Sequence, residues 1–179
     1  LWCSVRPNGD YRPFNLNRLE LRICDLVVDP IALLAMTALL EARIWQLLDH
    51  PELVPLESSR LPASTRADDL LALTAANEIA AARDSLDATL RHWQDGRTLL
   101  VRDWLAQLVE EVRPIAKDHG FACFLSPIQT MLREGNEAQI WLRHLAKGWT
   151  VQEVMQQAIR VTSERERELV HQVCQSRVA

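Results

Sequence analysis

The chain has little of several residue types on which nucleotide and metal sites are often built. Its 179 residues include only five glycines, and no glycine-rich loop that could cradle a phosphate is recognisable. Lysine is restricted to Lys117 and Lys147, so nearly all the positive charge is carried by arginine. Arginine stays protonated and binds carboxylates and phosphates through a planar fork, but it is a poor general base. The composition therefore suits anion binding by arginine, and an ordinary bias in codon usage would explain it equally well.

Cysteine is scarce and scattered. The sequence contains no CxxC pair and no cysteine–histidine cluster with the spacing of a zinc site. The four cysteines are Cys3, Cys24, Cys123 and Cys174. Widely separated cysteines of this kind are typical of reduced thiols inside a cell. We therefore expect a cytoplasmic protein.

Excess positive charge and long hydrophobic runs are also missing. The net charge is -4 and the isoelectric point is about 5.7, which argues against a nucleic-acid partner. The longest apolar run, residues 31–40, is shorter than a membrane-spanning helix, and no signal peptide is recognisable. We expect neither a membrane nor a nucleic acid among the partners, whereas a homo-oligomer is compatible with the sequence.

The length suggests one domain, or a compact part of a larger one. A chain of this size buries roughly two-thirds of its unfolded surface, so a hydrophobic core is available. The first residue is Leu1 rather than methionine, and we expect further residues upstream.

A charged strand is predicted near the amino terminus, after a loop rich in turn-forming residues at positions 1–17. Residues 18–24 alternate between apolar and charged side chains, which is the period of a β-strand. The apolar face holds Leu19, Leu21 and Ile23, and the charged face holds Arg18, Glu20 and Arg22. Burying these charges unpaired would cost several kcal/mol. They therefore pair with one another, face water on an edge strand, or bind phosphate and a metal ion.

The remainder of the chain is predicted to be mainly helical, with one short hairpin. Capping residues and prolines mark helices that begin at Pro30, near Thr65, near Arg102, at Ser126, at Asn136 and after Thr150. Residues 51–64 form a connection with three prolines. Residues 88–93 and 97–100 flank Asp95-Gly96, a turn signal for a hairpin, although a helix competes with that interpretation. The first of these helices is apolar on almost every side, so we expect it to be buried behind the sheet.

These elements predict one α+β domain over residues 1–179 that is predominantly helical. Residues 1–28 form the loop and the charged strand, and residues 29–179 are mainly helical. The strand and the hairpin pack on several helices.

Two stretches resemble motifs of one enzyme family. Val5-Arg6-Pro7 and Arg18–Asp25 together resemble the "RP … LE-x-R-x-x-D" signature of the bacterial and plant type of glutamate–cysteine ligase, within the wider carboxylate–amine ligase family. Asn77–Ala88 resembles the family segment "N-x-x-x-A-A-R-x-G-L-D-A", with Ser85 in place of the glycine. The two stretches occur in the order and at the approximate spacing of the family.

The resemblance implies the carboxyl-terminal segment of a glutamine synthetase-like catalytic fold. It implies an ATP- and Mg²⁺-dependent ligase of glutathione biosynthesis, with glutamate, cysteine and ATP as substrates. Glutamate would be activated as γ-glutamyl phosphate and then converted to γ-glutamylcysteine. The family's remaining metal carboxylates and its nucleotide site lie upstream of this segment, so we expect the 179-residue chain to be inactive by itself.

The resemblance also assigns candidate site residues. Glu20 matches the motif carboxylate and is the candidate metal ligand. Arg22 matches the motif arginine and is a candidate for catalysis and for binding phosphate or substrate, and Arg18 shares its face. Arg6 and Arg83 match family positions and are candidates for binding substrate or phosphate, while a surface or salt-bridging role is an equal alternative for both.

Two other functions remain open at this point. A carboxylate–amine ligase with another amine acceptor would show the same motifs, because the acceptor pocket has no signature here. A non-catalytic helical module that binds a partner or itself would show the same helical pattern.

Overall fold

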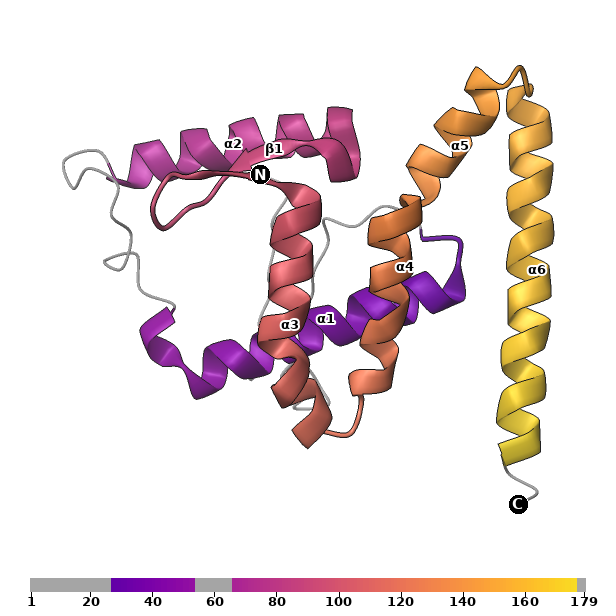
Figure 1. The fold of residues 1–179 in the computed structure, drawn as a ribbon, viewed down its shortest axis with the longest axis horizontal. Helices are drawn as coiled ribbons and strands as arrows, with labels where there is room; N and C mark the ends of the chain where they lie inside the picture. The colour runs from indigo at the N-terminus through magenta and orange to yellow at the C-terminus, as the bar shows by residue number, and fades with distance from the viewer. Residues whose placement is uncertain (1–26, 54–65, 177–179) are drawn as a thin grey trace, which may run out of the picture.

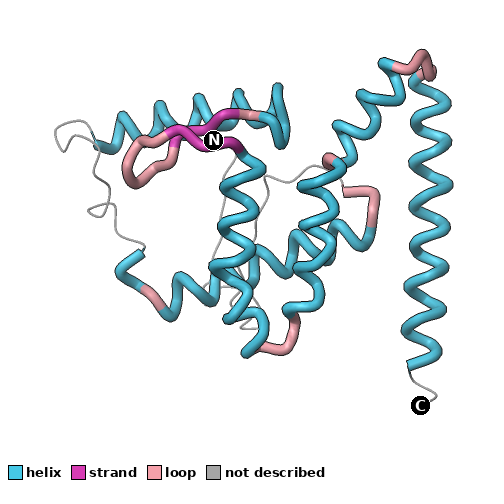
Figure 2. The backbone as a smooth tube through the Cα atoms, viewed as in Figure 1, coloured by secondary structure: helices cyan, strands magenta, loops and turns pink. Residues whose placement is uncertain are grey.

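The computed structural model describes residues 27–53 and 66–176. This part of the chain is mostly helical, with a small two-stranded antiparallel sheet (Figures 1 and 2). The helices are α1 (Pro30–Asp49), α2 (Arg66–Asp84), α3 (Val101–Asp118), α4 (Ser126–Glu134), α5 (Glu137–Ala146) and α6 (Val151–Ser176). The described residues also form three 3₁₀ turns, which are η1 (Pro51–Leu53), η3 (Ser85–Asp87) and η4 (Ala122–Leu125). The two strands are β1 (Thr89–Arg91) and β2 (Thr98–Leu100). The predicted strand at 18–24 lies outside the described residues.

The starts of α1, α5 and α6 follow the capping residues predicted from the sequence. The Asp29 carboxylate accepts a hydrogen bond from the Ile31 N–H at 2.9 Å, and Pro30 opens α1. Asn136 forms a reciprocal capping box with Gln139 at the start of α5. The predicted box between Thr150 and Glu153 is confirmed at the start of α6 by hydrogen bonds in both directions. Side-chain caps satisfy N–H groups that have no partner inside the helix, which helps to fix where α1, α5 and α6 begin, whereas α3 and α4 begin without a side-chain cap.

The hairpin is confirmed, and the competing helical interpretation of this stretch is wrong. β1 and β2 pair in antiparallel register, with Leu90 opposite Leu99. Gly96 at the turn has φ +73°, a left-handed conformation that glycine adopts without strain. Asp95 completes the turn by accepting a hydrogen bond from the Arg97 N–H at 3.1 Å.

The core lies where α1 crosses α3 and α4 (Figure 1). Small residues of α1 meet branched residues of the other elements, so the helix backbones approach closely. The buried cluster consists of Ala35, Ala38, Ala42, Val109, Val112, Ala116, Leu125 and Ile128. α2 lies along the hairpin at one end of the molecule, and α6 stands beside α5 and the start of α1 at the other.

The expectation that α1 is buried holds for one face only, and the strand behind which we expected it to lie is outside the described residues. Only its alanine face is fully buried, and bulky residues on its other faces are exposed, such as Leu33 at 50% and Leu48 at 65%. By length and composition α1 could also cross a membrane. Core helices pass the same test, and the alanine face of α1 is part of the core. Apolar composition therefore did not predict which neighbours this helix has.

Leu125 anchors the core, and its removal should be costly. Leu125 is fully buried, whereas the neighbouring Phe124 is 45% exposed. We expect Leu125→Ala to lower the free energy of unfolding by about 2–5 kcal/mol because it leaves a cavity. Phe124→Ala is the control and should cost much less. Urea unfolding of both variants checks this, and equal losses would contradict the assigned core.

Candidate functional site

Arg83 is the predicted site residue that falls within the described part of the chain. Arg6, Arg18, Glu20 and Arg22 lie outside it, so their assignments stay predictions. Arg83 lies in the last turn of α2, and its side chain is 72% exposed.

Among the described residues, the Arg83 guanidinium hydrogen-bonds to Asp84, the next residue in the chain. Its Nε lies 3.0 Å from each Asp84 carboxylate oxygen, and its Nη2 donates to Oδ2 at 2.7 Å. This hydrogen bonding raises the pKa of Arg83 and lowers the pKa of Asp84. The guanidinium is therefore exposed to solvent, where a ligand can compete with Asp84 for it.

Asn77, the first residue of the second motif, covers the outer edge of β1. Its Nδ2 donates to the Arg91 carbonyl at 2.8 Å, and its Oδ1 accepts from the Arg91 N–H at 2.9 Å. An edge strand leaves such groups without partners, and a side-chain amide can satisfy both at once. Asn77 therefore attaches α2 to the hairpin.

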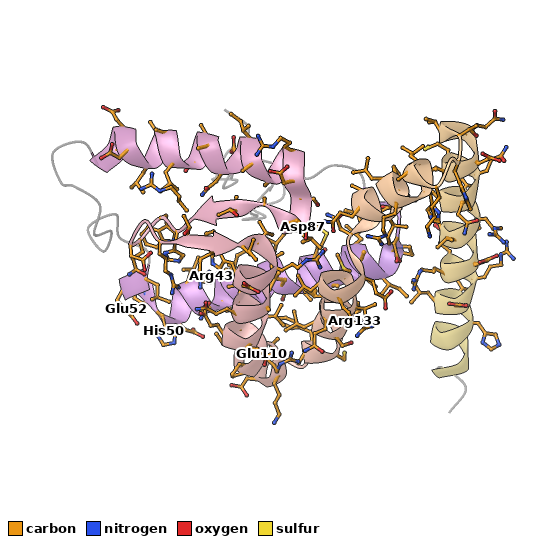
Figure 3. The ribbon with its side chains drawn as sticks, turned by 45° about the horizontal axis from the view of Figure 1, so that its top comes forward. Arg43, His50, Glu52, Asp87, Glu110 and Arg133 are labelled. Atoms are coloured by element: carbon orange, nitrogen blue, oxygen red, sulfur yellow. The ribbon has the colours of Figure 1, made fainter. Side chains whose placement is uncertain are left out.

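Asp87 joins the base of the hairpin to two helices (Figure 3). Its Oδ1 accepts from Arg102 Nε of α3 at 3.0 Å, and its Oδ2 accepts from Gln139 Nε2 of α5 at 2.8 Å. Arg102 also donates to the carbonyl of Leu132 in α4. One carboxylate and one guanidinium thereby tie η3, α3, α4 and α5 together. Charge-assisted bonds of this kind are stronger than neutral ones.

Ser85 adopts a backbone conformation that favours glycine. Its φ is +56°, and no other non-glycine residue in the described part of the chain has a positive φ. The Ser85 hydroxyl accepts a hydrogen bond from Asn136 Nδ2 at 2.6 Å, which holds the turn. The tight turn of the family pattern is therefore formed, although serine replaces the glycine of the pattern.

The second motif thus contributes mainly to the scaffold, while Arg83 and its partner Asp84 lie at the surface. Leu86 and Ala88 are buried, and Asn77 and Asp87 bind other elements. Sequence reasoning missed Arg102, Asn136 and Gln139 as partners of the motif. Nothing in their local sequence signals that role, because the partners come together only in the folded chain.

The described residues show no other centre that matches the predicted chemistry. No group of three histidine, cysteine, aspartate or glutamate residues among them could hold a metal ion. A shallow hollow of about 390 Å³ lies at the start of α6, away from Arg83. It is lined by Trp149, Glu153, Gln156, Gln157 and Arg160. None of the predicted site residues lines this hollow.

Comparison with known proteins confirms the family resemblance. The model of the family described as "Glutamate-cysteine ligase family 2 (GCS2)" matches residues 1–175. A protein of Leifsonia xyli subsp. xyli, named "Putative glutamate--cysteine ligase 2", is 42% identical over 80 residues, which cover 44% of this chain and 21% of that protein. A protein of Frankia casuarinae, named "Putative glutamate--cysteine ligase 2-1", is 31% identical over 135 residues, 75% of this chain and 32% of that protein. No solved structure matches this chain.

The matches to these curated relatives span about a fifth to a third of the relatives' own lengths.

The strained turn at Ser85 allows a direct test with two substitutions. Ser85→Gly and Ser85→Ala both remove the hydroxyl that binds Asn136, but only glycine relieves the left-handed backbone. We expect Ser85→Ala to be less stable than Ser85→Gly by about 1 kcal/mol. Thermal and urea unfolding of the two variants measure the difference. An alanine variant as stable as the glycine variant would contradict the turn described here.

Proposed function

Because this chain belongs to glutamate–cysteine ligase family 2, we propose that it is the carboxyl-terminal part of an ATP-dependent glutamate–cysteine ligase. The observation that carries the proposal is the family match across residues 1–175, together with the exposed Arg83 in a motif whose Asn77 and Asp87 hold the scaffold. The partial coverage of the relatives supports a catalytic unit that needs further residues. We place the protein in the cytoplasm, in glutathione biosynthesis.

The proposed reaction has two steps. An oxygen of the glutamate γ-carboxylate attacks the γ-phosphorus of ATP, which forms γ-glutamyl phosphate and releases ADP. The amine of cysteine then attacks the acyl carbon, loses a proton, and expels inorganic phosphate. Such chemistry depends on positioning and on compensating negative charge, which arginines supply.

Each candidate residue has a role in this scheme. Glu20 would hold Mg²⁺, which neutralises phosphate charge when bound. Arg22 and Arg18 would stabilise the charge on the transferring phosphoryl group. Arg6 and Arg83 would bind a substrate carboxylate or a phosphate. Arg83 fits its part because its side chain is exposed and its guanidinium pairs with Asp84, the next residue in the chain.

A helical interaction module is the second candidate, and it is favoured by apolar surface. Several large apolar side chains of α2 and α6 are well exposed, among them Leu71 at 63%, Ile79 at 67% and Ile159 at 62%. Calorimetric titration of the complete protein with glutamate, cysteine and Mg-ATP separates the two functions. No heat with any combination would favour the module. Heat with glutamate and Mg-ATP but none on adding cysteine would indicate a ligase with another amine acceptor.

The charged strand face is tested by Glu20→Gln and Arg22→Ala in the complete protein. Each substitution removes one charge that the transition state requires, so we expect a loss of about 100-fold or more in kcat for γ-glutamylcysteine formation. Circular dichroism should show that both variants remain folded. Normal turnover in both variants would remove these residues from the site.

Arg83 has a matched control in Arg133. Both arginines lie in the last turn of a helix, and each forms an ion pair with the acidic residue that follows it in the chain. Their side chains are about equally exposed, at 72% for Arg83 and 69% for Arg133. Arg133 is labelled in Figure 3. We expect Arg83→Ala to lower kcat/KM for glutamate or ATP by about 10-fold or more, because a charge-assisted contact to substrate is lost. Arg133→Ala should leave it within about 2-fold, as expected of an exposed ion pair. Equal effects would make Arg83 an ordinary surface arginine.

A further inference from the structure

Both residues of the α5 capping box reach across to the turn that follows Arg83. Asn136 Nδ2 donates to the Ser85 hydroxyl at 2.6 Å, and Gln139 Nε2 donates to Asp87 Oδ2 at 2.8 Å. The two pairs are 51 and 52 positions apart in the sequence. The turn at the end of α2 is therefore held by the same two side chains that begin α5.

The capping box uses both ends of each side-chain amide. Asn136 Oδ1 accepts from the Gln139 N–H at 3.0 Å, and Gln139 Oε1 accepts from the Asn136 N–H at 3.3 Å. The oxygens thus form the cap, and the nitrogens are left to donate to the turn. Each amide serves two partners at once, so the start of α5 and the turn at the end of α2 are fixed relative to each other.

The joint between α4 and α5 leaves room for this contact because its residue is glycine. Gly135 has φ +98°, a conformation that L side chains rarely adopt. A Cβ at this position would lie 3.1 Å from Gln139 Oε1 and 2.9 Å from Arg143 Nη1. Arg143 also donates to the Glu134 carbonyl at 2.6 Å. A side chain at position 135 would therefore crowd the amide that completes the capping box.

Ser85 needs a restraint from outside the turn more than glycine would. Its backbone is left-handed, with φ +56°, and a residue with a side chain adopts this conformation only at a cost in free energy. The hydrogen bond from Asn136 is partly buried, so water competes with it less than at an exposed site. The next residue, Leu86, is buried. Asn136 therefore stabilises a turn that serine alone does not favour.

We propose that Asn136 is a positioning residue for Arg83 in the ligase reaction and that it acts through Ser85. This inference rests on the proposed function. Arg83 lies in the last turn of α2, two positions before the residue that Asn136 holds, so the direction of its side chain depends on how α2 ends. Helix ends fray, and without the bond from Asn136 the turn has one restraint fewer. The exposed guanidinium then loses a fixed direction.

Hydrogen exchange tests the anchor independently of catalysis. Asn136→Ser keeps a good helix cap but removes the nitrogen that reaches Ser85. In the complete protein it should speed amide exchange at residues 84–88 by about 5-fold or more, because a local restraint is lost. In a Ser85→Gly background the same substitution should change this exchange by less than about 2-fold, because the hydroxyl is already absent. Thr150→Val is the control and should leave residues 84–88 unchanged, since Thr150 caps α6.

Kinetics of the complete protein connect the anchor to the reaction. Asn136→Ser should lower kcat/KM about 5-fold, mainly by raising KM for the same substrate, glutamate or ATP, whose KM rises in Arg83→Ala. In an Arg83→Ala background, Asn136→Ser should change kcat/KM by less than about 2-fold, because the side chain that it positions is gone. A general loss of stability would instead lower kcat/KM equally in both backgrounds. Thr150→Val should match the unaltered protein.

Several results would overturn the positioning role. Unchanged exchange at residues 84–88 in Asn136→Ser would show that the bond does not hold the turn. An equal loss of kcat/KM with and without Arg83 would show that Asn136 acts on stability alone, and normal kcat/KM in Arg83→Ala would leave it nothing to position. A complete protein that forms no γ-glutamylcysteine would refute the proposed function, and the role of Asn136 in the reaction with it, whereas the exchange result would still report on the anchor.

Discussion

The carboxylate of Asp87 is the polar group that links the hairpin to the helices of the described architecture. Through Arg102 and Gln139 it holds the base of the hairpin against α3 and α5, and Arg102 extends the connection to α4. The hairpin also contacts α2, because Asn77 of α2 donates a hydrogen bond to the Arg91 carbonyl of β1. These contacts fix the last turn of α2, where Arg83 points outward. The stretch Asn77–Ala88, which resembles a segment of the family, thus acts mainly as a scaffold that carries the exposed Arg83.

Arginine has two uses in this protein. Arg102 and Arg165 face carboxylates of distant elements and join parts of the fold, so they are structural cations. Arg83 and Arg133 contact only the next residue within the described part of the chain. The near absence of lysine is consistent with both uses, because a planar fork binds a carboxylate with more directional contacts than an ammonium group does. An arginine-rich composition therefore does not by itself indicate substrate binding.

Local features of the fold were predictable from the sequence, and long-range ones were not. Asn136 caps α5 and Asp95-Gly96 forms the hairpin turn because these residues act on backbone groups one to three positions away. Asp87 and Gln139 are 52 positions apart, so no local pattern reveals their bond. The exposure of Leu33 and Leu48 was missed because composition does not show which neighbours cover a helix. Of the candidate site, the structure describes Arg83, and the charged strand remains a prediction.

The most direct test of the account follows the phosphoryl group rather than the final product. If the complete protein forms γ-glutamyl phosphate, ATP labelled with ¹⁸O at the β,γ-bridge should exchange that label with the non-bridging β-oxygens when glutamate is present and cysteine is absent. The account predicts exchange that requires glutamate and Mg²⁺. Absence of exchange from a protein that binds both substrates would contradict it.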